Sequence, residues 1–159
     1  MIPPAKWLDQ NRPIEKMTWA PGEPPLVFNR LMLSQGWEAV PGVTTLNQYK
    51  PHIIREGDPR KARRWIKLVY RVFGREAKHI ILWLAHRVQR PAEKINHGLV
   101  LGGAQGIGKD TILEPVRLAV GEENFHEISP QDIFGTFNSF TKSVILRVNE
   151  GRKQPIRLL

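Results

Sequence analysis

The sequence of 159 residues contains no cysteine, and it has no long apolar run. Without cysteine it can form neither a disulfide framework nor a thiolate metal site, which fits a reducing compartment. No apolar stretch approaches the roughly 20 residues that span a bilayer. The N-terminal MIPPAKWLDQ lacks the basic-then-apolar layout of a signal peptide. We therefore expect a soluble cytoplasmic protein with no membrane partner.

Acidic residues are also scarce relative to basic ones. The chain has 24 Lys and Arg against 15 Asp and Glu, a net charge of +9, which favours a polyanionic partner such as nucleic acid. Eleven of the basic residues fall between positions 51 and 90, against three acids there. The candidate nucleic-acid contacts within this stretch are Arg60, Lys61, Arg63, Arg64 and Lys67. A solvated helix face is the alternative interpretation.

The pattern of prolines and tryptophans divides the chain into three segments. Residues 1–57 hold most of the prolines together with three of the five tryptophans, and we expect an extended arm with short strands. Residues 58–94 predict a basic helical module of two helices. Asp58 and Pro59 start the first helix, Gly74 separates the two, and Pro91 ends the second.

Residues 95–159 alternate strand and helix patterns. HGLVL (97–101), NFHEIS (124–129) and KSVILRVN (142–149) predict three short strands, and residues 109–120 predict a helix that closes at Gly121. We expect Pro115 to kink this helix or to leave it a short first segment. The alternation predicts an α/β fold with a parallel, incomplete phosphate-loop sheet of about three strands. A charged residue inside the last strand, Arg147, is expected to pair with an acid or to reach solvent.

A glycine-rich loop joins the first of these strands to the helix. The pattern of a glycine, four residues and then Gly-Lys is met by Gly103, Ala104, Gln105, Gly106, Ile107, Gly108 and Lys109. Glycines let backbone N–H groups turn inward around phosphate, and the helix adds its positive N-terminal end. Lys109 would reach the β- and γ-phosphates. The strand before the loop and the helix after it are the context that this Walker A motif requires.

The residue after Lys109 departs from the usual pattern, which has a Ser or Thr hydroxyl to hold Mg²⁺. Asp110 occupies that position and Thr111 offers a hydroxyl one residue later, so the metal ligand stays open between the two. A nucleotide hydrolase also needs an acid at the end of a neighbouring strand. Glu150 follows the last predicted strand and is the candidate, with Asn149 before it. A simple strand-end charge is the alternative for Glu150.

Four segments of the chain resemble the primase–helicase-associated ATPases of phages and mobile elements, in the superfamily 3 helicase group. They are WLDQNRPIEKMTWAPG (7–22), PGVTTLNQYKP (41–51), the stretch 79–116 with the phosphate loop, and NFHEISPQDIFGTFNSFTKSVILRVNEG (124–151). The Gly-Lys-Asp-Thr form of the loop is similar to the form that this family uses. The resemblance extends over most of the chain.

This resemblance implies ATP and Mg²⁺ binding, a homo-hexameric ring, and translocation on single-stranded DNA during phage-type replication, in a bacterial host or a phage. It implies that Lys109 is the phosphate lysine and Glu150 the catalytic acid, with Thr111 or Asp110 near Mg²⁺. The family continues past Glu150 with a sensor strand and an arginine finger, whereas only GRKQPIRLL follows here. We therefore expect a C-terminally truncated form that is inactive alone in hydrolysis and unwinding.

Two other functions fit parts of the pattern. A nucleoside monophosphate kinase has a similar loop, with Thr111 in place, but such enzymes begin close to their phosphate loop and carry an arginine-rich lid after it. A non-catalytic remnant would bind DNA or a partner through the basic residues and would not turn over ATP. Transfer of phosphate to a nucleoside monophosphate distinguishes the first, and DNA binding that ignores ATP distinguishes the second.

Overall fold

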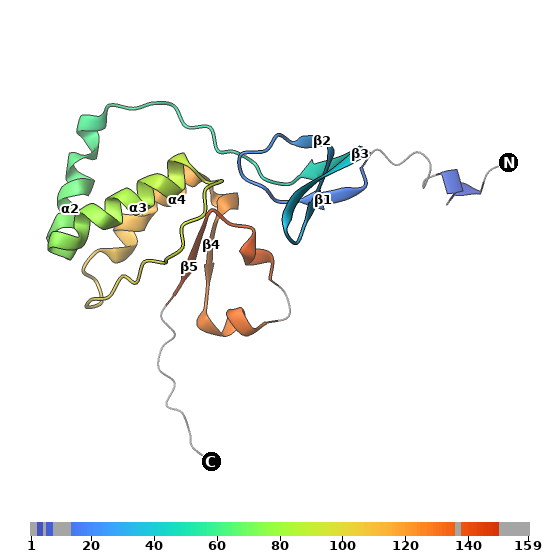
Figure 1. Cartoon of the computed structure of the whole chain (residues 1–159). Helices are drawn as coiled ribbons and strands as arrows, with labels where there is room; N and C mark the ends of the chain where they lie inside the picture. Colours follow the sequence, from blue (N-terminus) through green and yellow to red (C-terminus); the bar gives the residue numbers. More distant parts are fainter. Residues whose placement is uncertain (1–2, 5, 8–13, 136–137, 150–159) are drawn as a thin grey trace, which may run out of the picture. The chain divides into compact units, whose positions relative to one another are not determined.

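The computed structural model describes residues 3–4, 6–7, 14–135 and 138–149, and the chain divides into two units at residue 50 (Figure 1). The first unit comprises residues 1–50 and the second comprises residues 51–159. Within the described ranges, no helix has the length and apolar character needed to cross a membrane.

A three-stranded sheet forms in the first unit, where the sequence suggested an irregular arm with short strands. The strands are β1 (Lys16–Thr18), β2 (Leu26–Leu33) and β3 (Gly36–Asn47), in the order β1-β3-β2. β2 and β3 make an antiparallel hairpin, and β1 lies parallel to β3. β3 has 12 residues and is longer than the short strands expected, because the segment VPGV (40–43), a turn or extended signal, falls within it.

The irregular part of the hairpin contains that turn signal. The register passes from Phe28↔Thr44 to Arg30↔Ala39, so Pro41 and Gly42 lie in a bulge opposite Asn29. Asn29 has a φ of 58° and accepts a hydrogen bond from the Gly42 N–H at 2.8 Å. A bulge tolerates proline, which cannot donate to the ladder, and so the strand continues past it.

Asn47, at the end of β3, joins the sheet to the segment before β2. It is 5% exposed, and its side chain accepts from the Ala20 N–H at 2.9 Å and donates to the carbonyls of Ala20 and Glu23 at 2.8 and 2.9 Å. These bonds satisfy a buried amide that would otherwise destabilise the sheet. Trp19 packs edge-to-face on Tyr49 with ring centroids 5.6 Å apart.

The second unit begins with the two predicted helices. The 3₁₀ turn η1 (Pro59–Ala62) leads into α2 (Arg63–Phe73), the turn η2 (Gly74–Glu76) follows, and then comes α3 (Ala77–Gln89). Asp58 caps the start by accepting from the Arg60 N–H at 3.0 Å, with Pro59 in the first turn. Gly74 ends α2 with a φ of 54°. The helix boundaries expected from Asp58, Gly74 and Pro91 are thus confirmed.

The remaining elements are α4 (Lys109–Val120), η3 (Glu122–Asn124), β4 (Phe125–Ile128), η4 (Pro130–Phe134), η5 (Ser139–Thr141) and β5 (Ile145–Val148). β4 and β5 pair in parallel, which confirms the second and third predicted strands. α4 runs through Pro115 as one continuous helix, so the expected short first segment does not occur. Gly121 ends it with a φ of 86°.

The first predicted strand is absent. Residues 97–101 join neither described sheet, and the side chain of Val100 is 97% exposed. A strand exists only through a neighbour that accepts its backbone hydrogen bonds, and no strand in the described part of the second unit pairs with this segment. The described parallel sheet has two strands instead of about three.

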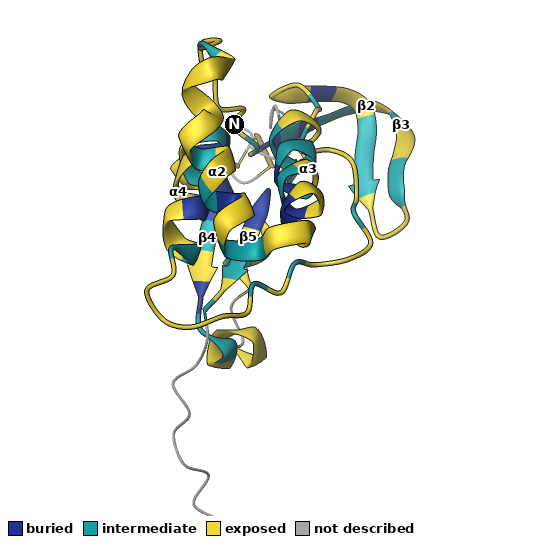
Figure 2. Ribbon diagram, turned by 90° about the vertical axis from the view of Figure 1, so that its left-hand side faces the viewer, coloured by how far each residue is buried: buried dark blue, intermediate teal, exposed yellow. Residues whose placement is uncertain are grey.

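The core of the second unit is formed mainly by the inner sides of the helices and by the ends of the two strands (Figure 2). Its buried apolar side chains include Val69, Ile80, Leu84, Ile112, Val116, Phe125 and Ile145. Two polar contacts join these elements. The Trp65 indole N–H on α2 donates to the carbonyl of Ile112 on α4 at 2.9 Å. Arg87 on α3 donates to the carbonyl of Val144, just before β5, at 3.0 and 3.1 Å.

Candidate functional site

The glycine loop adopts a conformation that ordinary side chains rarely reach. Gly103, Gly106 and Gly108 have φ values of 138°, 80° and 101°. A Cβ atom at Gly103 would lie 2.5 Å from Cδ1 of Ile107, whose side chain would have to move, and a φ of 138° would strain any other residue there. Positive φ at several nearby positions allows backbone N–H groups to face a common centre, as phosphate-binding loops require.

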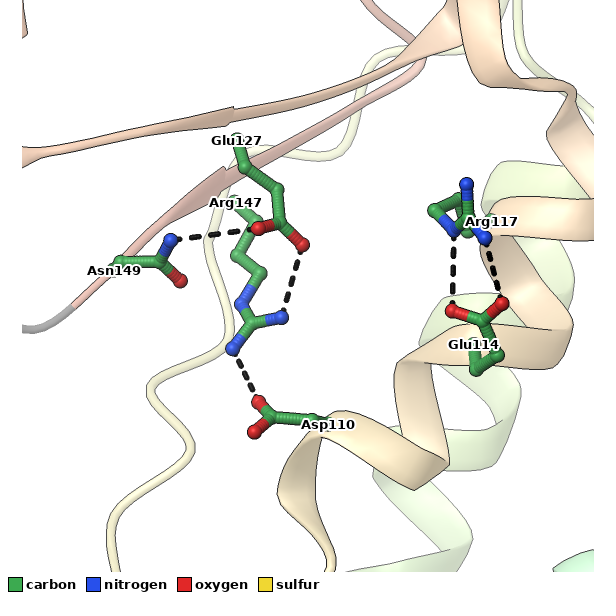
Figure 3. A network of polar contacts seen from close by, with 6 residues as sticks. All are labelled: Asp110, Glu114, Arg117, Glu127, Arg147 and Asn149. Carbon is green, nitrogen blue, oxygen red and sulfur yellow. Dashed lines mark hydrogen bonds and ion pairs between the residues drawn. The ribbon is translucent and has the colours of Figure 1, made fainter.

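The loop leads directly into the first turn of α4. Gly108 is the residue before the helix, and its carbonyl accepts from the Ile112 N–H at 3.1 Å. The N–H groups of the first turn have no intrahelical acceptor, and they carry the positive end of the helix dipole. Figure 3 shows Asp110, in this turn, joined to Arg147 of β5.

Lys109 folds back over the loop that precedes it. Its Nζ donates to the carbonyl of Gly103 at 2.6 Å and to that of Ala104 at 3.1 Å. An ammonium group has three N–H donors, so one remains for an anion in the loop. The lysine, the glycines and the open helix end therefore lie together, with Gln105 and Ile107 in the exposed part of the loop.

Asp110, one of the two candidate magnesium ligands, is bound to Arg147 (Figure 3). Arg147 comes from β5 and also pairs with Glu127 of β4, at 2.9 Å between Nη1 and Oε1. Glu127 and Arg147 are directly opposite in the strand register. The sequence marked Arg147 as an unusual strand residue that would pair with an acid or reach solvent, and the structure identifies the acids.

The other proposed site residues fall at the edge of this network. Thr111 is exposed in the first turn of α4. Asn149 follows β5, and its amide donates to the second oxygen of Glu127 at 3.4 Å. Glu150, the candidate catalytic acid, lies outside the described residues. Within the part of the chain that is described, no group of three His, Asp or Glu side chains could hold a metal by itself.

A second ion-pair cluster lies further along α4. Arg117 pairs with Glu114 at 2.7 Å and with Glu122 at 2.6 Å. The hydrogen bonds from Arg117 hold the pKa of Glu114 below its ordinary value and raise the pKa of Arg117. Figure 3 shows this pair apart from the Arg147 network, so Glu114 is a helix-surface charge outside that network.

The basic residues singled out in the sequence occupy η1 and the solvent side of α2. Lys61, Arg63, Arg64 and Lys67 are exposed, and in the described structure none makes a salt bridge. Arg60 differs, because its guanidinium binds Asp58 at 2.9 Å. This pairing lowers the pKa of Asp58. The structure therefore leaves four of the five candidates exposed without a bonded acid in the described residues, three of them on α2, and pairs the fifth with an acid.

The same face has members that the sequence analysis did not assign. Successive residues of an α-helix turn by about 100°, so Tyr70 and Arg71 lie next to Arg63 and Lys67. Tyr70 is 48% exposed, and Ile66 beside it is 37% exposed. We call this set the α2 basic face; its members are Arg63, Arg64, Ile66, Lys67, Tyr70 and Arg71. The sequence did contain a signal for this face, because Tyr70 is an aromatic residue at helical spacing from Arg63 and Lys67.

These features define a mixed α/β fold whose glycine loop and small parallel sheet correspond to an incomplete nucleotide-binding-like fold. Comparison with family models and with curated proteins finds no match. Among solved structures, the chain is similar to the apo structure of NrS-1 C terminal region, at a TM-score of 0.56 and 19% identity. The match covers 84% of this chain and 31% of that one. It shows a shared fold over less than a third of the NrS-1 region.

Proposed function

We propose that this chain carries the ATP-binding part of a phage-type replicative DNA helicase of the superfamily 3 kind. The observation that carries the proposal is Lys109 lying over three positive-φ glycines at the start of a helix. The family resemblance of the loop and the fold shared with the NrS-1 region support it. ATP would place its β- and γ-phosphates in the loop, and Mg²⁺ beside the first turn of α4.

The residues of the loop fit a triphosphate. Gly103 has a φ of 138° that favours glycine, the helix end supplies N–H donors, and Lys109 retains a donor for a phosphate oxygen. Bound Mg²⁺ would neutralise charge between the β- and γ-phosphates. In the intact protein, hydrolysis would involve Glu150 by resemblance, and a homo-hexamer would couple it to movement along single-stranded DNA.

The α2 basic face supports a nucleic-acid partner for the same protein. Single strands are bound where cations follow the backbone and an aromatic ring stacks on a base. Arg63, Lys67 and Arg71 supply the cations, and Tyr70 supplies an exposed ring between them. We propose that this face contacts single-stranded DNA.

The first test is binding of a fluorescent ATP analogue to the 159-residue chain, with and without Mg²⁺. Lys109→Ala should abolish binding because it removes the cation at the phosphates. Lys78→Ala removes an exposed lysine from α3 and is the matched control, for which we expect no change. If the folded chain binds no analogue, or if both variants behave alike, the phosphate site is wrong.

A second test separates the helicase from a non-catalytic DNA-binding protein. Affinity for a labelled oligothymidine is measured with and without the ATP analogue. A response of DNA binding to the analogue supports the helicase, whereas binding that ignores it favours the remnant. Phosphate transfer to a nucleoside monophosphate would instead indicate the kinase.

A further inference from the structure

Arg147 connects the phosphate helix to both strands of the parallel sheet. Its guanidinium binds Asp110 on the first turn of α4 and Glu127 on β4, while its own backbone belongs to β5 (Figure 3). Its side chain is 27% exposed, against 78% for Asp110. A planar guanidinium with several fixed donors suits this bridging position, which the single ammonium group of a lysine does not reproduce.

The bridge also determines the charge next to the phosphate loop. Asp110 places a carboxylate beside the site of a triphosphate, and Glu127 adds a second one on the neighbouring strand. Arg147 pairs with both of these carboxylates, whereas the Lys109 ammonium binds the loop carbonyls of Gly103 and Ala104. Without Arg147 the two carboxylates would lose their bonded cation beside the proposed phosphate site, and like charges at this range oppose binding.

We propose that Arg147 is a positioning residue of the nucleotide site, and that its bond to Asp110 leaves Thr111 as the protein ligand of Mg²⁺. This inference rests on the proposed ATP site, since it concerns the metal that accompanies the nucleotide. Asp110 then holds the first turn of α4 against β5, and the hydroxyl of Thr111 takes the role that Ser or Thr has in the usual loop pattern.

Variants at the two candidate ligands separate this proposal from direct coordination by Asp110. The measured quantity is the ratio of analogue affinities with and without Mg²⁺, at low salt. Thr111→Val should bring the ratio close to one. Asp110→Asn should leave the ratio unchanged and should not weaken Mg²⁺-free binding, because it removes a negative charge. If Asp110→Asn lowers this affinity ratio as far as Thr111→Val does, the proposal is overturned.

Removal of the arginine tests the positioning role. Arg147→Ala should weaken analogue binding about five- to tenfold, the effect of about one uncompensated unit charge at an exposed site. The double variant Arg147→Ala with Asp110→Asn should recover most of that loss, since the uncompensated carboxylate is gone. Arg147→Lys should restore only part of it. Failure of Asp110→Asn to rescue Arg147→Ala would contradict the proposal.

Thermal unfolding keeps the test independent of the ATP site. The wild type, Asp110→Asn, Arg147→Ala and the double variant form a double-mutant cycle of Tm values. Asp110 and Arg147 should be coupled, so that the double variant loses less than the two single losses combined. If the wild-type chain binds no analogue, the proposed function fails; absence of coupling in Tm would then reject the bridge itself.

Discussion

The phosphate loop and the α2 basic face are both cationic, but they are built differently. The loop has one lysine, held at 2.6 Å on a backbone carbonyl, within a conformation that depends on particular glycines. The α2 basic face has four exposed cations without bonded acids in the described structure, and no fixed geometry. A preorganised site depends on each member, whereas a distributed one shares its affinity among interchangeable contacts.

After the loss of binding expected for Lys109→Ala, the largest expected effect comes from strain in the loop. Gly103→Ala places a side chain at a φ of 138°, where strain costs about 1–3 kcal/mol, so affinity for the ATP analogue should fall about thirtyfold. Gly102→Ala is the matched control, because Gly102 has open space and no left-handed φ. Equal affinities in the two variants would mean that the loop conformation does not matter for binding.

On the α2 basic face, the double variant Arg63→Ala, Arg64→Ala should reduce the salt dependence of binding to single-stranded DNA. Loss of two phosphate contacts lowers the slope of log affinity against log salt by about 1.4. The control is Arg75→Ala, Arg90→Ala, whose guanidinium groups already bind Glu76 and Glu93, both at 3.2 Å. Titrations at several salt concentrations give the slopes. Identical slopes for the two double variants would make the face an ordinary solvated surface.

The aromatic ring on the same face should matter less than the cations. Tyr70→Ala should weaken binding of single-stranded DNA about fivefold, at the lower end of base stacking on aromatic residues, with the salt slope unchanged. Tyr70→Phe keeps the ring and should bind as the wild type does. Competition titration with labelled oligothymidine measures both. If Tyr70→Ala changes the salt slope, or if Tyr70→Phe loses as much affinity as Tyr70→Ala, stacking is excluded.

The smallest expected effect concerns Arg60, the one cation that is paired with an acid among the five candidate nucleic-acid contacts. Asp58→Asn preserves an N-cap residue but releases Arg60, so DNA affinity should rise about twofold, with a slope steeper by at most about 0.7. The control, Asp132→Asn, removes a carboxylate that instead binds Ser129. A similar gain in both variants would indicate a general effect of net charge.

The same pair makes a pH prediction. Arg60 lowers the pKa of Asp58 in the folded chain, so the charged form is favoured in the folded state. The stability from this pair is therefore present above the unfolded pKa of about 3.9 and is lost as the pH falls through the lower folded value. The Tm difference between the wild type and Asp58→Asn should disappear across that acidic range. A difference that persists below it would assign the stability to another group.

Local signals predicted the helices of the second unit well. Asp58 with Pro59, Gly74 and Gly121 each fix a helix end through the conformation of one or two residues, so their effect can be inferred without knowing the rest of the fold. The parallel pairing of β4 and β5 followed from the alternation of strand and helix patterns along residues 95–159. Of the two effects expected of Pro115, the short first segment does not occur, because α4 is one helix from Lys109 to Val120.

Predictions that depend on distant partners were less successful. HGLVL has the composition of a strand, but a strand also needs a neighbour, and none pairs with it in the described residues. In the first unit, VPGV was a turn or extended signal, and only the structure shows that it lies inside β3, in the bulge opposite Asn29. The Asp110–Arg147 bridge joins positions 37 residues apart, so sequence alone could mark the arginine but not its partner.

The contact between Trp65 and the Ile112 carbonyl has a consequence for how this chain can evolve. One side of α2 supports the helix of the phosphate loop through Trp65 and through Leu68, which would lie 3.5 Å from a Cβ at Gly108. The other side meets solvent. Under the proposed function, substitutions on the outer side would change DNA binding without disturbing the loop, whereas those on the inner side would also change the support of α4. A single helix would thus separate two properties that can vary independently.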